Sequence, residues 1–491
     1  DGQQRIATLS ILAPAVIATL QGLGDTDEQR AANQDRARRL RERFIGEKDP
    51  ASLQESSKLF LNETDDGFYQ DYLVQLRTPL NPRRLPRSNR LLWECFGWFR
   101  SRLASRAAQG GEALASLLSE TVARQLLFIL ITVEDDLSAY VVFETLNARG
   151  LELSSTDLLK NFLFSRVQAA PDLAALQRRW KSLVEIVRQE RFPDFLRYHL
   201  LCDTPQVRKQ RLFKLVQGRV RTPAAVFALM DDLERRAELF AALNDADHEY
   251  WLERRDARPY VRELILFRVR QTTPLLFAAF ERFEPADFVR VLKLLSVVSF
   301  RYTVVSGLNT NELEPVYHRA AKAVLDGRVT TPAEVFAEIR GIYVGDEAFE
   351  RDFGALDLDT SGQRKRLVKY VLCKLESDAS GVARDYEADT GTIEHILPEN
   401  PGVEWDAYFD PQRQAEQVYR LGNLTLLEAS LNRQVGNQLL AAKRALYAQS
   451  GYTLTRAVAG EADDAWSPAA LARRQAHMAR RAAHVWRSDF E

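Results

Sequence analysis

The amino-acid sequence predicts a mainly α-helical protein with small α+β parts, and three observations support this fold class. From residue 166 to about residue 343, apolar residues recur at spacings of three and four, which is the period of an amphipathic helix. Residues 392–397 and 423–427 are short apolar segments with strand character. A helical segment follows them at 430–443, and this strand–strand–helix order fits a ββα-metal hairpin.

The composition bounds the class of protein. The 491 residues are enough for two to four domains, and we divide them into residues 1–165, 166–345 and 346–491. No stretch reaches the roughly 18 apolar residues of a membrane span, so no membrane partner is expected. The three cysteines are widely spaced, which excludes a disulfide framework and a zinc ribbon and indicates a reducing cytoplasm.

The first domain begins with a polar motif, Asp1-Gly2-Gln3-Gln4-Arg5, that leads into an amphipathic helix at 6–20. A Gly-containing polar loop at a helix N-terminus suits a phosphate, because free backbone N–H groups and the helix dipole favour an anion. Arg5 would add a charge-assisted contact. The alternative is that Asp1 caps the helix and that the Gln and Arg side chains are solvated.

The rest of the first domain mixes helices with short strands. Residues 27–50 carry charges of both signs at helical spacing, which predicts a solvated helix. Residues 59–62 and 125–133 predict short strands, the second of them buried, and the Pro- and Arg-rich segment 76–88 predicts a loop. Residues 91–103 carry an aromatic stripe that we assign to the core: Trp93, Phe96, Trp98 and Phe99.

Residues 139–161 predict two helices with a sharp boundary between them. Gly150 is suited to end the first helix, and Ser154 with Asp157 forms a capping box that starts the second. These structural roles explain several of the polar residues in this region without any ligand.

The middle domain is helical almost throughout. Its histidines, His199, His248 and His318, stand singly without metal-ligand spacing, so we interpret them as structural. The predicted helical segments are 173–187, 226–243, 260–270, 274–283, 288–300 and 313–325.

The C-terminal domain carries the residues with the clearest chemical meaning: Glu394, His395, Asn423, Asn432 and Asn437. Phosphodiester hydrolysis needs a base that removes a proton from water, and a neutral imidazole is suited to this near pH 7. It also needs a hard divalent cation with oxygen ligands. We therefore assign His395 as the general base and Glu394 and Asn432 as ligands of Mg²⁺ or Mn²⁺. Asn423 braces the histidine loop, and Asn437 competes with Asn432 for the metal.

A last helix begins after Trp466, with Ser467 as N-cap and Pro468 in its first turn. It is basic and contains no acid between Ser467 and Ser488, although the whole chain has 67 basic and 68 acidic residues. Any DNA contact must therefore come from local patches. The candidate contacts are Lys443, Arg473, Arg474, Arg480 and Arg481; the alternative is that these side chains cap or pack against the domain.

The ordered C-terminal set resembles the nuclease domain of GmrSD-type restriction proteins, domain-of-unknown-function family 1524. The resemblance rests on Glu-His-Ile-Leu-Pro at 394–398, Leu-Gly-Asn-Leu-Thr-Leu at 421–426, the asparagine pair at 432 and 437, and Lys443. It implies a His-Asn-His nuclease with a divalent metal.

The N-terminal motif resembles domain-of-unknown-function family 262, the N-terminal half of GmrSD-type proteins, which is related to the ParB/sulfiredoxin fold. The resemblance implies binding of a nucleotide, GTP or ATP, by Asp1, Gln3, Gln4 and Arg5. The Phe-Glu-x-Leu-Asn string at 143–147 and the Asp-Leu-Leu-Lys-Asn string at 157–161 match a second signature of that family. They add Glu144, Asn147, Asp157 and Lys160 to the candidate pocket. Because the chain begins inside the first motif, an upstream segment that completes the pocket is expected.

Together these resemblances imply a bacterial anti-phage endonuclease that cuts double-stranded, modified DNA and is regulated by an N-terminal nucleotide-binding domain. The expected partners are DNA, a nucleotide and a second copy of the chain as a homodimer. The alternative is a nucleotide-gated sensing or interaction module whose nuclease is weak or silent. The DNA modification, the nucleotide and the choice between nicking and double-strand cutting stay open.

Overall fold

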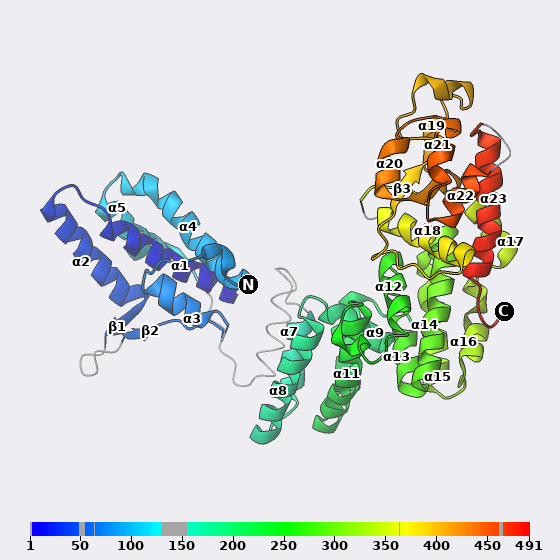
Figure 1. The fold of residues 1–491 in the computed structure, drawn as a ribbon. Coiled ribbons are helices and arrows are strands. Elements are labelled where there is room, and N and C mark those ends of the chain that lie inside the picture. Colours follow the sequence, from blue (N-terminus) through cyan, green and yellow to red (C-terminus); the bar gives the residue numbers. More distant parts are fainter. Residues whose placement is uncertain (1, 49–54, 63, 129–154, 363, 461–464) are drawn as a thin grey trace. The chain divides into compact units, whose positions relative to one another are not determined.

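The computed structural model describes the chain apart from residues 1, 49–54, 63, 129–154, 363 and 461–464 (Figure 1). The chain forms two compact units, residues 1–153 and 154–491, and both are mainly helical, as the sequence predicts. Helix α7 (Ser155–Ser165), which the predicted division places in the first domain, packs on α8 (Ala170–Val187) in the second unit. The helical middle and the C-terminal region share that second unit.

The first unit combines helices with a two-stranded antiparallel sheet. Helix α1 packs against α2 and α4, and its residues from Ile11 to Leu20 supply much of the core. Helix α2 has acids in its first turn and arginines in its last turn, the distribution that the helix dipole favours. The helix predicted at 27–50 is therefore confirmed up to Phe44, while residues 46–48 form strand β1. The elements are α1 (Gly2–Gln21), α2 (Asp27–Phe44), β1 (Gly46–Lys48), β2 (Glu55–Ser57), α3 (Asp66–Phe68), η1 (Tyr69–Val74), η2 (Pro82–Arg84), α4 (Arg87–Ala107), α5 (Gly111–Ser116) and η3 (Leu117–Gln125).

Two strands predicted in this unit are wrong where the structure describes them. Residues 59–62 form no strand, because side chains take their backbone groups: Gln70 Nε2 donates to Leu59 O, and Leu61 N donates to Asp66 Oδ1. The segment 125–133 begins at the end of the π-helix η3, and the residues after it form no strand as far as they are described. Leu127 is 95% exposed, so this part of the segment is not buried. Residues 129–133 lie outside the described residues.

The aromatic stripe of α4 is core only in part. Phe96 is buried, Trp93 and Phe99 are half-buried, and Trp98 is exposed, with the Arg102 guanidinium 5.3 Å from its ring centroid. The predicted helix end at Gly150 and the capping residue Ser154 lie outside the described residues.

In the second unit, each of the six helical segments predicted between residues 173 and 325 is confirmed. Helix α7 is followed by α8 and then by the helices that form the middle of the unit (Figure 1). None of the helices in the described parts of the chain has the length and apolarity needed to span a membrane. The elements after α8 are α9 (Phe192–Leu201), η4 (Lys209–Arg211), α10 (Leu212–Arg219), α11 (Pro223–Leu243), η5 (Glu249–Trp251), α12 (Arg258–Phe267), α13 (Thr273–Arg282), α14 (Pro285–Ser299), η6 (Phe300–Val305), η7 (Thr310–Glu312), α15 (Leu313–Leu325) and α16 (Pro332–Ile339).

The middle histidines have structural partners, in agreement with their interpretation. His199 Nδ1 lies 3.0 Å from Arg236 Nη1, and burial holds the pKa of His199 well below its ordinary value. His318 Nδ1 lies 2.6 Å from Leu201 O, and the side chain of His248 accepts a hydrogen bond from Tyr250 N.

The C-terminal part of the unit contains a second two-stranded antiparallel sheet followed by helices. Strand β3 pairs with β4 so that Glu394 lies opposite Thr425 and His395 lies opposite Leu424. The helix predicted at 430–443 is two helices, because Gly436 has a φ of 46°, a conformation that ends α20. The elements are η8 (Arg340–Ile342), α17 (Asp346–Ala355), α18 (Arg364–Ser380), β3 (Thr392–His395), η9 (Val403–Ala407), α19 (Gln414–Val418), η10 (Leu421–Asn423), β4 (Leu424–Leu427), α20 (Ala429–Val435), α21 (Leu440–Tyr447), α22 (Thr453–Ala459) and α23 (Pro468–Val485).

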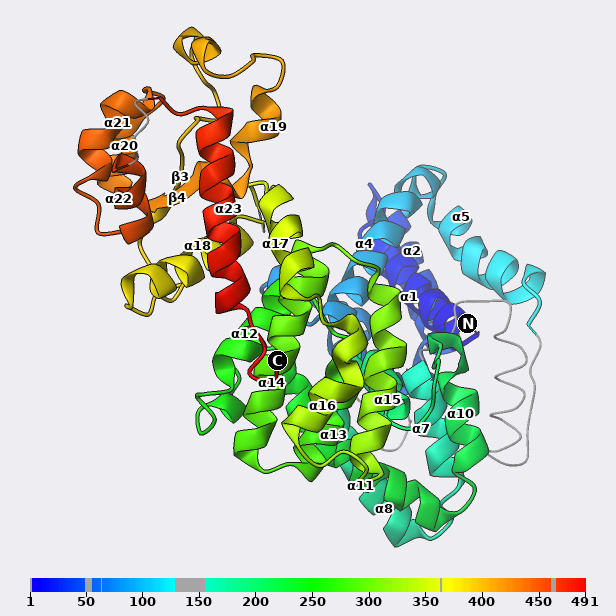
Figure 2. The ribbon, with the colours of Figure 1, turned by 90° about the vertical axis from the view of Figure 1, so that its right-hand side faces the viewer.

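Helix α23 joins the sheet region to the helical middle. It packs on α17 and α18 (Figure 2), and its N-cap Ser467 accepts a hydrogen bond from Ala470 N, as predicted. Trp486, just after its end, is buried as predicted and stacks on Phe300 with ring centroids 4.1 Å apart. The fully buried Arg301 donates to Trp486 O and Ala483 O. The end of α23 is therefore fixed to the middle helices.

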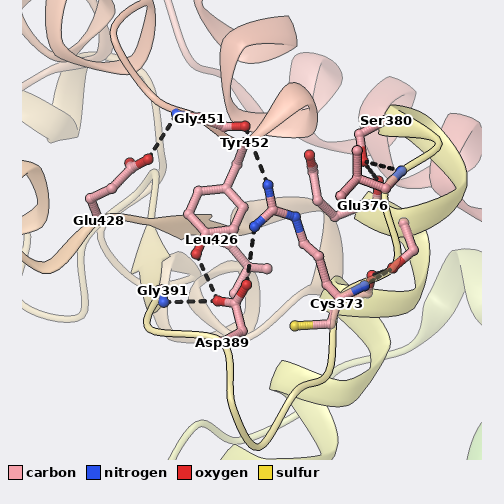
Figure 3. A network of polar contacts seen from close by, with 12 residues as sticks. Cys373, Glu376, Ser380, Asp389, Gly391, Leu426, Glu428, Gly451 and Tyr452 are labelled. Atoms are coloured by element: carbon pink, nitrogen blue, oxygen red, sulfur yellow. Dashed lines mark hydrogen bonds and ion pairs between the residues drawn. The ribbon is translucent and has the colours of Figure 1, made fainter.

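A polar network fixes the start of β3 (Figure 3). Asp389 accepts hydrogen bonds from the Tyr452 hydroxyl at 2.6 Å and from Gly391 N at 2.8 Å, and it forms an ion pair with Arg384 at 3.1 Å. Arg384 also lies over the Tyr452 ring, 4.4 Å from its centroid. These contacts hold the chain just before the strand that carries Glu394 and His395.

Candidate functional site

Asn423 lies at the end of η10. Both the oxygen and the nitrogen of its side-chain amide form hydrogen bonds that hold the loop after His395. Its Oδ1 accepts from Leu397 N and Trp466 Nε1, and its Nδ2 donates to Leu397 O and Val418 O, all at 2.8–2.9 Å. The side chain is completely buried. Asn423 therefore braces the histidine loop in the way that the sequence predicts, through backbone groups two residues after His395.

Gly422 positions Asn423 against α23. A Cβ on Gly422 would lie 2.7 Å from Leu471 O and 2.8 Å from Gln475 Cβ, so the residue is small because a helix approaches it closely. Gly422 lies in the turn η10 just before β4, and its φ is not positive. The buried Gln475 accepts from Gly422 N through Oε1 and donates through Nε2 to Phe353 O and Leu356 O.

His395 ends β3 and has partners from three other segments. Its Nε2 lies 3.3 Å from Thr360 Oγ1 and 3.6 Å from Glu399 Oε1, and its ring meets that of Tyr419 edge-on at 6.0 Å. Its side chain is 13% exposed. Burial lowers the pKa of His395, and Glu399 opposes this shift. The imidazole is therefore neutral at physiological pH, the state that a general base requires.

Sequence reasoning missed the three partners of His395. Thr360 lies 35 positions before the histidine and belongs to no motif. Glu399 stands one residue after the quoted Pro398 and has the i, i+4 spacing to His395, which was the available signal. Tyr419 precedes the glycine–asparagine motif and is placed by backbone pairing with the segment that contains Thr360.

Glu394 projects to the other side of β3 and forms a buried ion pair with Lys443. Lys443 Nζ donates to Glu394 Oε1 at 2.7 Å and also to His395 O and Ile396 O. Tyr447 donates to the same Oε1 at 2.7 Å. Burial raises the pKa of Glu394 and lowers the pKa of Lys443, and their mutual attraction opposes both shifts.

The geometry separates Asn432 from Asn437. Asn432 Nδ2 donates to Thr392 Oγ1 at 2.9 Å and to Ile393 O at 3.2 Å, so this side chain lies against β3 next to Glu394. Asn437 Nδ2 donates instead to Asn400 O, and its own carbonyl accepts from Trp405 Nε1. Asn432 is therefore the asparagine that contacts β3, the strand that carries the predicted metal ligand Glu394.

The donor set fits a small, hard cation. The amide oxygen of Asn432 accepts no hydrogen bond within the described residues, and Glu394 retains acceptor capacity, because a carboxylate has about four lone-pair sites. No group of three or more His, Cys, Asp or Glu side chains suited to a metal occurs in the part of the chain that the structure describes. Two protein oxygens are typical of Mg²⁺, which keeps waters and binds substrate phosphates.

Two of the five predicted DNA contacts are wrong because their side chains are buried. Lys443 is fully buried on Glu394, and Arg474 donates from the interior to Gly422 O and Leu424 O. Arg481 forms an ion pair with Asp378. Arg473 and Arg480 are exposed on α23.

The predicted nucleotide residues fall in different parts of the chain. Asp1, Glu144 and Asn147 lie outside the described residues. Gln3, Gln4 and Arg5 lie in the first turns of α1, which begins at Gly2, so the predicted loop is helical from that residue onward. The side chains of Gln4 and Arg5 are exposed. Asp157 and Lys160 lie on α7 in the second unit, where the Lys160 ammonium is 5.7 Å from the Phe164 ring.

Comparison with known protein families gives two matches. Residues 343–481 match the C-terminal domain of the GmrSD restriction endonucleases, and residues 1–164 match the N-terminal domain of that restriction endonuclease. The first range contains the whole site from Thr360 to Gln475. No curated protein matches the chain. The chain belongs to the GmrSD restriction endonucleases and carries both of their domains, which makes it a DNA endonuclease.

Proposed function

We propose that the endonuclease site lies at the end of β3 and that His395 is its general base, in a metal-dependent His-Asn-His arrangement. The observation that carries this proposal is a half-buried imidazole whose loop is fixed by all four hydrogen bonds of Asn423. A base held in a fixed position is what the abstraction of a proton from water requires. Two oxygen donors support the assignment: Glu394 precedes His395 on β3, and Asn432, on α20, contacts Thr392 and Ile393 of that strand.

The chemistry divides between the protein and the cation. Mg²⁺ or Mn²⁺, when bound, neutralises charge that develops on the phosphate. Glu394 and Asn432 would hold it, and Lys443 and Tyr447 orient the Glu394 carboxylate from behind, as partners of a ligand do. His395 accepts the proton of the attacking water, and the loop held by Asn423 keeps the imidazole in place.

We further propose that DNA approaches along the start of α18. Arg364 and Lys365 are exposed, follow the His395 partner Thr360 closely in the chain and form no ion pair within the described residues. No acid occurs in the first turn of α18. The helix dipole disfavours positive charges at the N-terminal end of a helix, so Arg364 and Lys365 do not stabilise α18 through the dipole. A phosphate backbone at His395 would be neutralised by these side chains.

We propose that the N-terminal domain binds GTP or ATP and regulates cleavage of modified DNA in anti-phage defence, with the chain acting in the cytoplasm and a homodimer as its assembly. The N-terminal family match and the motif from Asp1 to Arg5 support this part of the proposal.

The nuclease assignment is tested by cleavage of supercoiled plasmid with Mg²⁺ or Mn²⁺. The chain should cut, EDTA should stop the reaction, and His395→Ala should lower the rate at least about 100-fold, the lower end for a general base. Because burial lowers the pKa of His395, the acidic limb of the pH–rate profile should lie below the ordinary imidazole value of about 6.5. Equal cutting by both proteins contradicts the assignment. Nucleotide binding without cleavage of modified or unmodified DNA would favour a sensing module with a silent nuclease.

The DNA path is tested by the salt dependence of DNA binding. The double variant Arg364→Ala/Lys365→Ala should weaken binding and lower the slope of log K against log salt by about 2, since each phosphate contact contributes roughly 0.9. Arg319→Ala/Lys322→Ala on α15 removes two exposed cations from the helical middle and is the matched control. An unchanged slope in the first variant would exclude this surface.

A further inference from the structure

The contacts of Thr360 define where its single hydroxyl proton lies. Thr360 Oγ1 donates to Glu399 Oε1 at 3.1 Å. A hydroxyl has one proton and two acceptor lone pairs. Toward His395 Nε2, which lies 3.3 Å away, the same oxygen can therefore only accept. The proton of that hydrogen bond must come from the imidazole.

Glu399 adds a second reason for a proton on Nε2. An ionised carboxylate is an acceptor only, and Glu399 Oε1 lies 3.6 Å from Nε2. Glu399 also acts on Tyr419, since burial and then the Glu399 carboxylate raise the pKa of the Tyr419 hydroxyl. An unprotonated Nε2 would place its lone pair toward two oxygen lone pairs, whereas a protonated Nε2 meets two acceptors. The surroundings of His395 thus select one tautomer.

The position of Thr360 is fixed by the pairing of residues 356–358 with the backbone of residues 419–421. Leu358 N donates to Tyr419 O at 2.9 Å, and Leu421 N donates to Leu356 O at 3.3 Å. Asp357 and Arg420 form a β-bridge between these two hydrogen bonds. Thr360 is therefore presented to His395 by strand-like pairing.

From this geometry we propose that Thr360 and Glu399 are positioning residues that hold His395 in the tautomer with Nε2 protonated, so that Nδ1 is the atom that receives the proton of water. This inference rests on the proposed role of His395 as general base. In the reaction, an O–H bond of water breaks and its proton goes to Nδ1 while the water oxygen bonds to phosphorus. The P–O bond to the leaving oxygen breaks, and that oxygen takes a proton from solvent. The Nε2 proton stays in place, and Glu399 stabilises the imidazolium.

Nitrogen-15 NMR of protein labelled at its six histidines tests the tautomer without any cleavage. At about pH 8, above the ordinary imidazole pKa, His395 should show a protonated Nε2 and an unprotonated Nδ1. The signals are assigned as those lost in His395→Ala. In Thr360→Val, which keeps the shape and loses the hydroxyl, and in Glu399→Leu, at a half-exposed position, the other tautomer should gain population. An unprotonated Nε2 in the unaltered protein overturns the proposal.

Kinetics supply the second readout. Thr360→Val should lower kcat by roughly 10- to 100-fold, the range typical when the partner of a functional histidine is removed, and leave KM unchanged. Thr360→Ser restores the hydroxyl and should restore kcat. Wild-type kcat in Thr360→Val, with the fold confirmed by circular dichroism, overturns the positioning role. If His395→Ala cuts normally, the proposed function fails, while the tautomer measurement still decides the geometry.

Discussion

Lys443→Met is expected to lower the free energy of unfolding of the C-terminal region by about 3–5 kcal/mol, the range for breaking a buried ion pair from one side. The Lys443 ammonium donates hydrogen bonds to three acceptors, Glu394 Oε1 and the carbonyl oxygens of His395 and Ile396. Methionine fills a similar volume but donates nothing. Glu394 would then be a buried carboxylate with Tyr447 as its remaining side-chain donor. The loss is measured by guanidinium unfolding followed by tryptophan fluorescence.

The double variant Glu394→Gln/Lys443→Met shows how much of the stability loss comes from the unpaired charge of Glu394 and how much comes from changed packing. It removes both charges, so it should lose less stability than Lys443→Met alone, because replacing both partners of a buried pair is far less costly than removing one. Cleavage should be lost in both variants, since each disturbs Glu394. A Lys443→Met protein of normal stability but weakened DNA binding would contradict the burial of this lysine and favour the DNA-contact role predicted from the sequence.

This lysine shows why the DNA contacts were harder to predict than the catalytic set. A positive charge on a helix is exposed by default, and nothing in the local sequence marks Lys443 or Arg474 as interior. Each is buried because a distant segment offers acceptors: the end of β3 for Lys443, and the carbonyls of Gly422 and Leu424 for Arg474. These contacts depend on the tertiary structure and are not encoded in the sequence next to either residue.

The elements that the sequence did predict are those with local causes. The six helices of the middle follow from apolar periodicity, and the N-cap Ser467 follows from hydrogen bonds within one turn. The hairpin of β3 and β4 follows from two apolar segments with the expected order. By contrast, Thr360 lies near His395 only because Leu358 pairs with Tyr419 across a long stretch of chain. The strand predicted at 59–62 is wrong for a related reason, since the side chains of Gln70 and Asp66 form hydrogen bonds with the backbone of this segment.

Asn423→Ala is expected to cost both stability and cleavage. The substitution leaves Leu397 N, Leu397 O, Val418 O and Trp466 Nε1 without their partner in the interior. An unsatisfied buried group costs about 1–3 kcal/mol, so the lower end of the sum is about 4 kcal/mol. The loop after His395 would lose its brace, and the imidazole would lose its fixed position.

The stability effect of Asn423→Ala is read from the guanidinium unfolding midpoint, followed by tryptophan fluorescence, to which Trp466, its hydrogen-bond partner, contributes as one of seven tryptophans. Asn432→Ala is the matched comparison. Asn432 is half-buried and its side chain donates two hydrogen bonds, so its replacement should cost much less stability while still reducing metal-dependent cleavage. Comparing the two variants thus distinguishes the role of Asn423 in holding the loop from the role of Asn432 as an oxygen ligand of the cation. Equal stability of the two variants would show that the Asn423 hydrogen bonds do not hold the histidine loop, and full cleavage by Asn432→Ala would remove Asn432 from the metal set.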